Sequence, residues 1–232
     1  MFFFDPYYLI FMIPALILMF IAQRRVQSAY KKWSQVPNRL RLSGAEVAER
    51  LISRLGLYGL RVEEASGTLT DNFDPARHIL HLSSANSSGQ SVAAMAIVAH
   101  EIGHAMQEQE AYLPLRFRSA IVPAVNIGSY LGWILILAGL LLRYVQIAWI
   151  GVFVFSLGAV FALATLPVEF NASRRALQLL TENGMITAPD EQKGVRSVLN
   201  AAAMTYVAGL ATAIFQLLYY VMLVSGIGRR RA

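Results

Sequence analysis

Cysteine is absent from this 232-residue chain, and charged residues are scarce. The absence of cysteine excludes a disulfide framework, a thiolate metal site and a cysteine nucleophile. Charged residues make up 15% of the chain, whereas a soluble domain has about 25%. Several long apolar runs account for the shortfall, so the composition argues against an ordinary cytosolic domain.

The apolar residues gather in four runs that are long enough to cross a membrane as helices, at about 2–22, 120–142, 147–166 and 201–227. The first run has no Lys or Arg before it and no small-residue cleavage site after it, so we expect an anchor and not a cleaved signal peptide. Only four residues separate the second run from the third, which predicts a membrane hairpin.

Lys and Arg near the ends of the runs predict how the chain is oriented. Six of them lie between residues 23 and 41, whereas the hairpin loop holds only Arg143. We therefore expect the segments 24–119 and 167–200 to face the cytoplasm, with the lipid bilayer as a partner. The same count places the basic tail Arg229-Arg230-Arg231 outside, against the usual rule. No nucleic-acid-binding motif accompanies the positive charge.

The segment between the first two runs has the pattern of a small folded unit. Ser43 and Glu46 predict a capping box at the start of a helix that Gly56 ends. Short extended stretches at 60–63, 68–70 and 78–82 predict a small antiparallel sheet of two or three strands. A polar loop is expected at 83–89, and a second helix from Ser91.

The second helix contains the pattern H-E-x-x-H, formed by His100, Glu101 and His104. Residues four apart share one face of a helix, so both imidazoles can bind one Zn²⁺. Glu101, beside the metal, is the candidate catalytic base. A bland interpretation is a helix with two hydrogen-bonded histidines, but such polar groups on an apolar helix are costly without a partner.

A zinc site of this type needs a third protein ligand. Glu169 is the preferred candidate, because a carboxylate next to a membrane span is costly unless it has a role. Pro167 is expected to stand in the first turn of a new helix that carries it. His78 and His81 are alternatives, although a three-residue offset in a strand directs them to opposite faces. A surface pair between Glu169 and Arg174 or Arg175 is the bland interpretation.

Three segments, Leu69–Pro75, Ala99–Ala105 and Leu166–Ser173, resemble the YugP-type family of bacterial membrane zinc metallopeptidases. The resemblance covers almost the whole chain and implies a zinc peptidase with His100 and His104 as ligands and Glu101 as base. More distantly, the pattern is similar to the HtpX-type integral-membrane gluzincins, whose third ligand is a Glu followed four residues later by an Asp. Glu169 fits that ligand, but Ser173 stands at the Asp position, so Asn171 or Ser173 could support a histidine only without charge.

The predicted fold is a mostly α integral membrane protein of about four transmembrane helices, with a small α+β zincin-like metallopeptidase domain at the cytoplasmic face. The predicted parts are a first transmembrane helix (1–23), the metallopeptidase region (24–119), a transmembrane hairpin (120–166), a cytoplasmic helix with the third ligand (167–200), and a last helix with a basic tail (201–232).

The predicted function is a multi-pass, membrane-bound zinc endopeptidase of the bacterial inner membrane, which cleaves membrane or membrane-proximal proteins with Glu101 as general base. Its metal ligands are His100, His104 and Glu169. The alternatives are a non-catalytic scaffold or regulator with a structural zinc, and a zinc transporter. Tyr206, Arg174 and Arg175 are further candidates, as oxyanion donors, although a structural role explains each of them more simply. Asp71 and Asp74 could shape a substrate-binding strand edge, and an ordinary turn explains them equally well.

Overall fold

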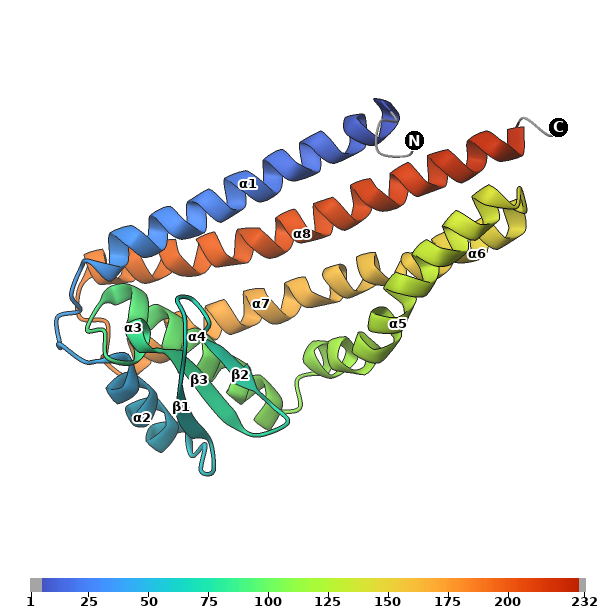
Figure 1. The fold of residues 1–232 in the computed structure, drawn as a ribbon. Helices are drawn as coiled ribbons and strands as arrows, with labels where there is room; N and C mark the ends of the chain where they lie inside the picture. The colour runs from blue at the N-terminus through green and yellow to red at the C-terminus, as the bar shows by residue number, and fades with distance from the viewer. Residues whose placement is uncertain (1–5, 230–232) are drawn as a thin grey trace. The chain divides into compact units, whose positions relative to one another are not determined.

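A computed structural model describes residues 6–229, of which 227–229 are described by their backbone only. Four long helical stretches and a short helix–sheet region make up the described chain (Figure 1). The elements in order are α1 (Pro6–Ser34), α2 (Gly44–Leu55), β1 (Arg61–Ala65), β2 (Asn72–Asp74), β3 (Ile79–Ser83), α3 (Ser84–Ser87), α4 (Val92–Gln109), α5 (Leu113–Leu141), α6 (Val145–Phe155), α7 (Leu157–Glu182) and α8 (Pro189–Arg229).

Within residues 6–229, four helical stretches are long and apolar enough to cross a membrane: α1, α5, α6 with α7, and α8. The predicted count of four candidate spans is therefore confirmed, while the start of the first run and the end of the basic tail lie outside the described residues. The expectation of a new helix at Pro167 is wrong, because α7 continues through it to Glu182. Proline removes one backbone hydrogen bond, and a long helix packed against others tolerates that loss.

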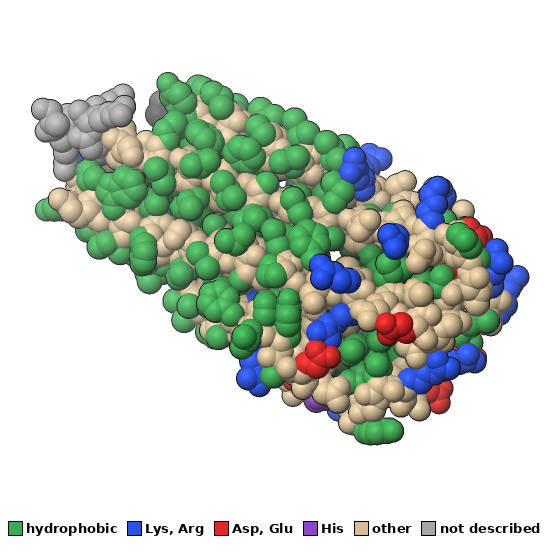
Figure 2. Space-filling view, turned by 180° about the vertical axis from the view of Figure 1, so that it is seen from behind, with side chains coloured by type: hydrophobic (Ala, Val, Ile, Leu, Met, Phe, Trp, Pro, Cys, Tyr) green, Lys and Arg blue, Asp and Glu red, His purple; other side chains and the backbone are tan. Residues whose placement is uncertain are grey.

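The chain divides into two compact units. The first holds the residues up to Ala22, Arg116–Pro167 and those from Thr205 on; the second holds Gln23–Leu115 and Val168–Met204. On the face that Figure 2 shows, the first unit is almost entirely hydrophobic, whereas charged side chains gather on the second. An apolar surface of this kind is what a lipid environment requires.

In the first unit, glycines bring α5 and α6 close together. A Cβ added to Gly132 would lie 2.7 Å from the backbone nitrogen of Phe155, and one added to Gly151 would lie 2.5 Å from that of Ile136. Such distances leave no room for a side chain, so the small residues permit the contact between the two helices.

The second unit is built around α4, whose first five residues, Val92 to Ala96, are all buried. Helix α2 packs on the same core and begins with the predicted capping box of Ser43 and Glu46. It ends at Gly56, which adopts the left-handed conformation with φ of 64°.

The three strands form one sheet in the order β1–β3–β2. Strand β2 is antiparallel to β3, but β1 is parallel to β3, so the expectation of a purely antiparallel sheet is wrong. Strand β3 is almost fully buried and takes the centre, while the exposed β1 forms one edge. The second strand lies at Asn72–Asp74 instead of 68–70, because Leu69 has a φ of 57° and belongs to a turn. Part of the expected polar loop forms α3.

Candidate metal centre

Helix α4 places His100, Glu101 and His104 on adjoining positions of one helical face. Its N-terminus is fixed by Ser91, whose hydroxyl accepts the backbone N–H of Ala94 at 3.1 Å. The apolar turns that follow are buried on all sides and anchor the helix in the core of the second unit. The two histidine side chains retain about an eighth of their surface exposed, at 12% and 13%. Both histidines are therefore mostly buried but keep some contact with solvent.

Glu169 on α7 meets both histidines. Its Oε2 lies 3.3 Å from Nε2 of His100 and 3.5 Å from Nε2 of His104, and the Glu169 side chain is 4% exposed. Ligand atoms of all three residues lie within 4.8 Å of one another. In tetrahedral coordination at about 2.0–2.1 Å, neighbouring ligand atoms are about 3.3–3.4 Å apart. The spacing and the donor set of two imidazoles and one carboxylate fit a zinc ion, so these residues form a candidate metal site.

The Nδ1 atoms of both histidines have partners outside this group. Nδ1 of His104 lies 3.0 Å from Oε1 of Gln107, and Nδ1 of His100 lies 3.3 Å from the hydroxyl of Ser173. Of the two predicted supporting residues, Ser173 thus contacts a histidine directly. Sequence reasoning missed Gln107. Its position one turn after His104 was the available signal, because residues three apart are neighbours on a helix.

Glu101 is oriented by the edge strand β2. Its Oε2 accepts the backbone N–H of Phe73 at 3.0 Å. Burial raises the pKa of the Glu101 carboxyl above its usual value, although His100 and His104 oppose this effect. Burial by itself would lower the pKa of the His104 imidazole, but hydrogen bonding to Glu169 and the charges of Glu101 and Glu169 raise it. Protons and a cation would therefore compete for the same side chains at this site.

The two aspartates around β2 have different surroundings. Asp71 accepts hydrogen bonds from the backbone N–H of Ser83 at 2.9 Å and from the side chain of Asn86 at 2.7 Å, and so fixes the start of β2 to the end of β3 and to α3. Asp74 accepts the backbone N–H of Ala76 at 2.9 Å. Asp74 is therefore a turn residue, whereas Asp71 tethers the strand that contacts Glu101.

The other candidates lie elsewhere. His78 is exposed and its Nε2 lies 3.5 Å from Glu108, and neither His78 nor His81 joins the group of possible metal ligands among the described residues. Arg174 is exposed, and Tyr206 belongs to the first compact unit.

Arg175, the remaining oxyanion candidate, binds Glu110 through both terminal nitrogens at 2.7 and 2.8 Å. This pairing holds the pKa of the Glu110 carboxyl below its usual value. The contact joins α7 to the end of α4, so Arg175 has a structural partner near the site.

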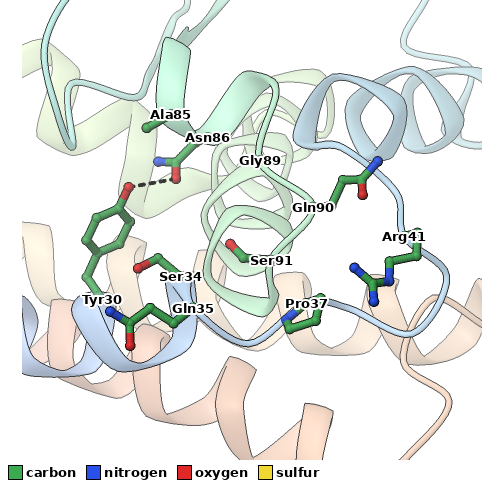
Figure 3. A pocket seen from close by; sticks show the side chains of 10 residues that line it. All are labelled: Tyr30, Ser34, Gln35, Pro37, Arg41, Ala85, Asn86, Gly89, Gln90 and Ser91. Atoms are coloured by element: carbon green, nitrogen blue, oxygen red, sulfur yellow. Dashed lines mark hydrogen bonds between the residues drawn. The ribbon is translucent and has the colours of Figure 1, made fainter.

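A polar pocket of about 520 Å³ lies at the other end of α4 (Figure 3). Its wall includes Ser91, which precedes His100 by nine residues, about 13 Å along the helix axis. Figure 3 shows the hydroxyl of Tyr30 pointing to Asn86, to which it donates a hydrogen bond of 3.1 Å. Because Asn86 also binds Asp71, this hydrogen-bond network extends from the pocket to the start of β2.

Comparison with known proteins agrees with this geometry. Residues 8–225 match the family model described as "Putative neutral zinc metallopeptidase". The chain is 44% identical over 211 residues to the "Putative membrane protease YugP" of Bacillus subtilis (strain 168), covering 91% of this chain and 93% of that protein. No solved structure matches. A family match over nearly the whole chain, together with a relative of this identity, shows that the chain belongs to this family of neutral zinc metallopeptidases.

Proposed function

We propose that this protein is a membrane-bound zinc endopeptidase in which His100, His104 and Glu169 hold the metal and Glu101 is the general base. The observation that carries the proposal is the convergence of both Nε2 atoms on Oε2 of Glu169, at 3.3 and 3.5 Å, beside a half-buried Glu101. A zinc ion bound there would supply Lewis-acid activation of water and of the scissile carbonyl.

Glu101 takes up the proton from the attacking water and returns it to the leaving amine. The Phe73 N–H fixes one carboxylate oxygen, which restricts the rotamer of the side chain. Preorganisation of this kind lowers the cost of reaching the transition state.

An extended substrate would bind along β2. This strand is an edge of the sheet, and its Phe73 N–H is directed to Glu101 and not to β3. Because that N–H is already donated, a peptide paired with the outer edge of β2 would donate its own N–H to the Phe73 carbonyl and so lie beside the catalytic base. The substrates proposed are membrane or membrane-proximal proteins, because the four candidate spans confine the enzyme to the bilayer.

The distribution of Lys and Arg supports an active site that faces the cytoplasm. All the residues assigned to the metal and to the base belong to the second unit, which also carries the basic segment between residues 23 and 41. Retention of such segments on the cytoplasmic side is the usual outcome of membrane insertion.

The competing function is a scaffold or regulator in which the zinc is structural. A structural site is closed by four protein ligands and has no use for an unligated glutamate beside its first histidine. A zinc transporter would need several ionisable residues within its spans, whereas each candidate span has a stretch of 18 residues with at most two.

The test is the variant Glu101→Gln in the purified full-length protein, loaded with zinc. Peptide cleavage should fall by at least about 100-fold, the contribution of a general base, while the zinc content stays at one ion per chain. Glu64→Gln, on the exposed edge strand β1, is the matched control. Cleavage that survives in Glu101→Gln would contradict the mechanism.

A further inference from the structure

We infer that Gln107 is the positioning residue of the metal centre, because it orients the His104 ring and also holds the peptide group next to Glu169. The inference rests on the proposed function for the identity of the ligands. It assigns a role to a side chain that neither binds the metal nor touches the substrate.

The orientation of the Gln107 amide is determined by its partners. Its Nε2 donates to the backbone carbonyl of Val168 at 2.8 Å and to Oδ1 of Asn171 at 2.9 Å. Both partners are acceptors, so the nitrogen of the amide must face α7 and the oxygen must face His104. Burial strengthens this requirement, because Gln107 has no exposed surface and an unpaired amide group there would be costly.

The amide oxygen in turn selects the form of the imidazole. Oε1 of Gln107 can only accept, so Nδ1 of His104, at 3.0 Å, carries the proton. In the neutral ring the lone pair then lies on Nε2, the atom 3.5 Å from Glu169. This is the tautomer that binds a metal through Nε2.

The same side chain fixes the other helix. The carbonyl of Val168 belongs to the peptide group between Val168 and Glu169. Its hydrogen bond to Gln107 therefore fixes the position of Glu169 along the axis of α4. Asn171 extends the contact, because its Oδ1 also accepts the N–H of Arg175 Nε at 2.7 Å, and Arg175 binds Glu110, the residue that follows α4. These hydrogen bonds therefore connect α7 to α4 at Gln107 and again at the C-terminal end of α4.

The distinguishing experiment compares Gln107→Met with Gln107→Glu in the full-length protein. Zinc affinity is measured by competition with a chromogenic chelator, and stability by thermal unfolding of the metal-free form. Met keeps the volume but removes both links, so zinc should bind about 10–100-fold more weakly, the usual effect of losing such a partner. Glu keeps the acceptor for His104, so zinc should bind at least tenfold more tightly than in Gln107→Met.

The two variants should rank in the opposite order for stability, because the second carboxylate oxygen of Gln107→Glu would face the Val168 carbonyl and Oδ1 of Asn171 without a donor, which destabilises the metal-free fold more than a methionine does. If Gln107 only fills space, Gln107→Met should bind zinc more tightly and unfold at a higher temperature than Gln107→Glu. The exposed neighbour Gln109→Met is the control and should leave the affinity unchanged. Zinc affinity equal to wild type in Gln107→Met, or weaker binding in Gln107→Glu than in Gln107→Met, would overturn the inference.

A second variant applies if the Gln107 variants do not fold. Asn171→Leu changes a half-buried residue and removes one of the two acceptors of the Gln107 amide. A zinc affinity of Asn171→Leu between those of wild type and Gln107→Met supports the role of Gln107. If Gln107→Met does not fold, an affinity of Asn171→Leu measurably below wild type supports it. An unchanged affinity overturns it. Wild-type protein that binds no zinc would instead refute the proposed function, so the two failures are distinguishable.

Discussion

The backbone N–H of Phe73 donates to Oε2 of Glu101 at 3.0 Å, joining the edge strand β2 directly to the candidate catalytic base. A strand that orients the base and also offers an edge for a substrate couples the two tasks. Displacement of β2 should therefore change the position of Glu101 and the place of the substrate together.

Asp71→Ala should impair cleavage without removing zinc. The substitution removes the acceptor for the Ser83 N–H and for Asn86, which hold the start of β2. A displacement of about 1 Å at the reacting groups can reduce the rate about 100-fold. The measurements are kcat/KM on a peptide substrate and bound zinc. Asp74→Ala, which loses bonds only within its own turn, is the control and should have a smaller effect; full activity in Asp71→Ala would contradict the role of β2.

Glu169→Ala should remove most of the bound zinc. The carboxylate is the third of three protein ligands in the proposed site, and two imidazoles alone hold zinc weakly. Metal content after dialysis against a weak chelator measures the loss. Glu182→Ala, at the end of the same helix, should retain the metal. Full zinc occupancy in Glu169→Ala would contradict the assignment of Glu169 as a metal ligand.

Gly103→Ala should weaken both the fold and the zinc site. A Cβ at Gly103 would lie 2.9 Å from the carbonyl oxygen of Ala172 and 3.3 Å from its Cα, so the backbone of α7 must move. Overpacking of this kind costs about 1–3 kcal/mol, and the shift would carry Glu169 away from the histidines. Unfolding in detergent and zinc affinity are the measurements.

The control for that variant is Gly209→Ala in α8, where an added Cβ meets nothing within 4 Å. It should be neutral or raise stability by up to about 1 kcal/mol through helix propensity. Equal stability and zinc affinity in Gly103→Ala and wild type would contradict the tight packing of α4 against α7 at this contact.

Introduced cysteines can test the orientation, because the natural chain has none. Tyr58 is 85% exposed in the second unit, and Tyr144 is 59% exposed between α5 and α6. In intact cells, a membrane-impermeant maleimide should label Tyr144→Cys and leave Tyr58→Cys unlabelled, since the positive charges predict a cytoplasmic second unit. Opening the cells should expose Tyr58→Cys to the reagent. Labelling of Tyr58→Cys in intact cells would reverse the proposed orientation.

The sheet and the supporting residues were the parts that local patterns could not predict. The parallel pairing of β1 with β3 depends on which strand is buried at the centre, and this follows from packing against α4. The contact of Phe73 with Glu101 uses a backbone N–H, which every residue but proline has and which leaves no mark in the sequence. The link from Gln107 to α7 has no local pattern, because its partners are more than sixty residues away in the chain.

The sequence by itself determined the features that depend on neighbours along the chain. Apolar run length predicts four candidate spans, the spacing of His100 and His104 follows from the helical repeat, and Ser43 with Glu46 predicts a helix start. Only the tertiary structure decided that Glu169 lies within 3.5 Å of both imidazoles and that Gln107 joins the two helices. Such contacts require the core of the second unit to be packed, because side chains on separate helices meet only when burial fixes the helices against one another.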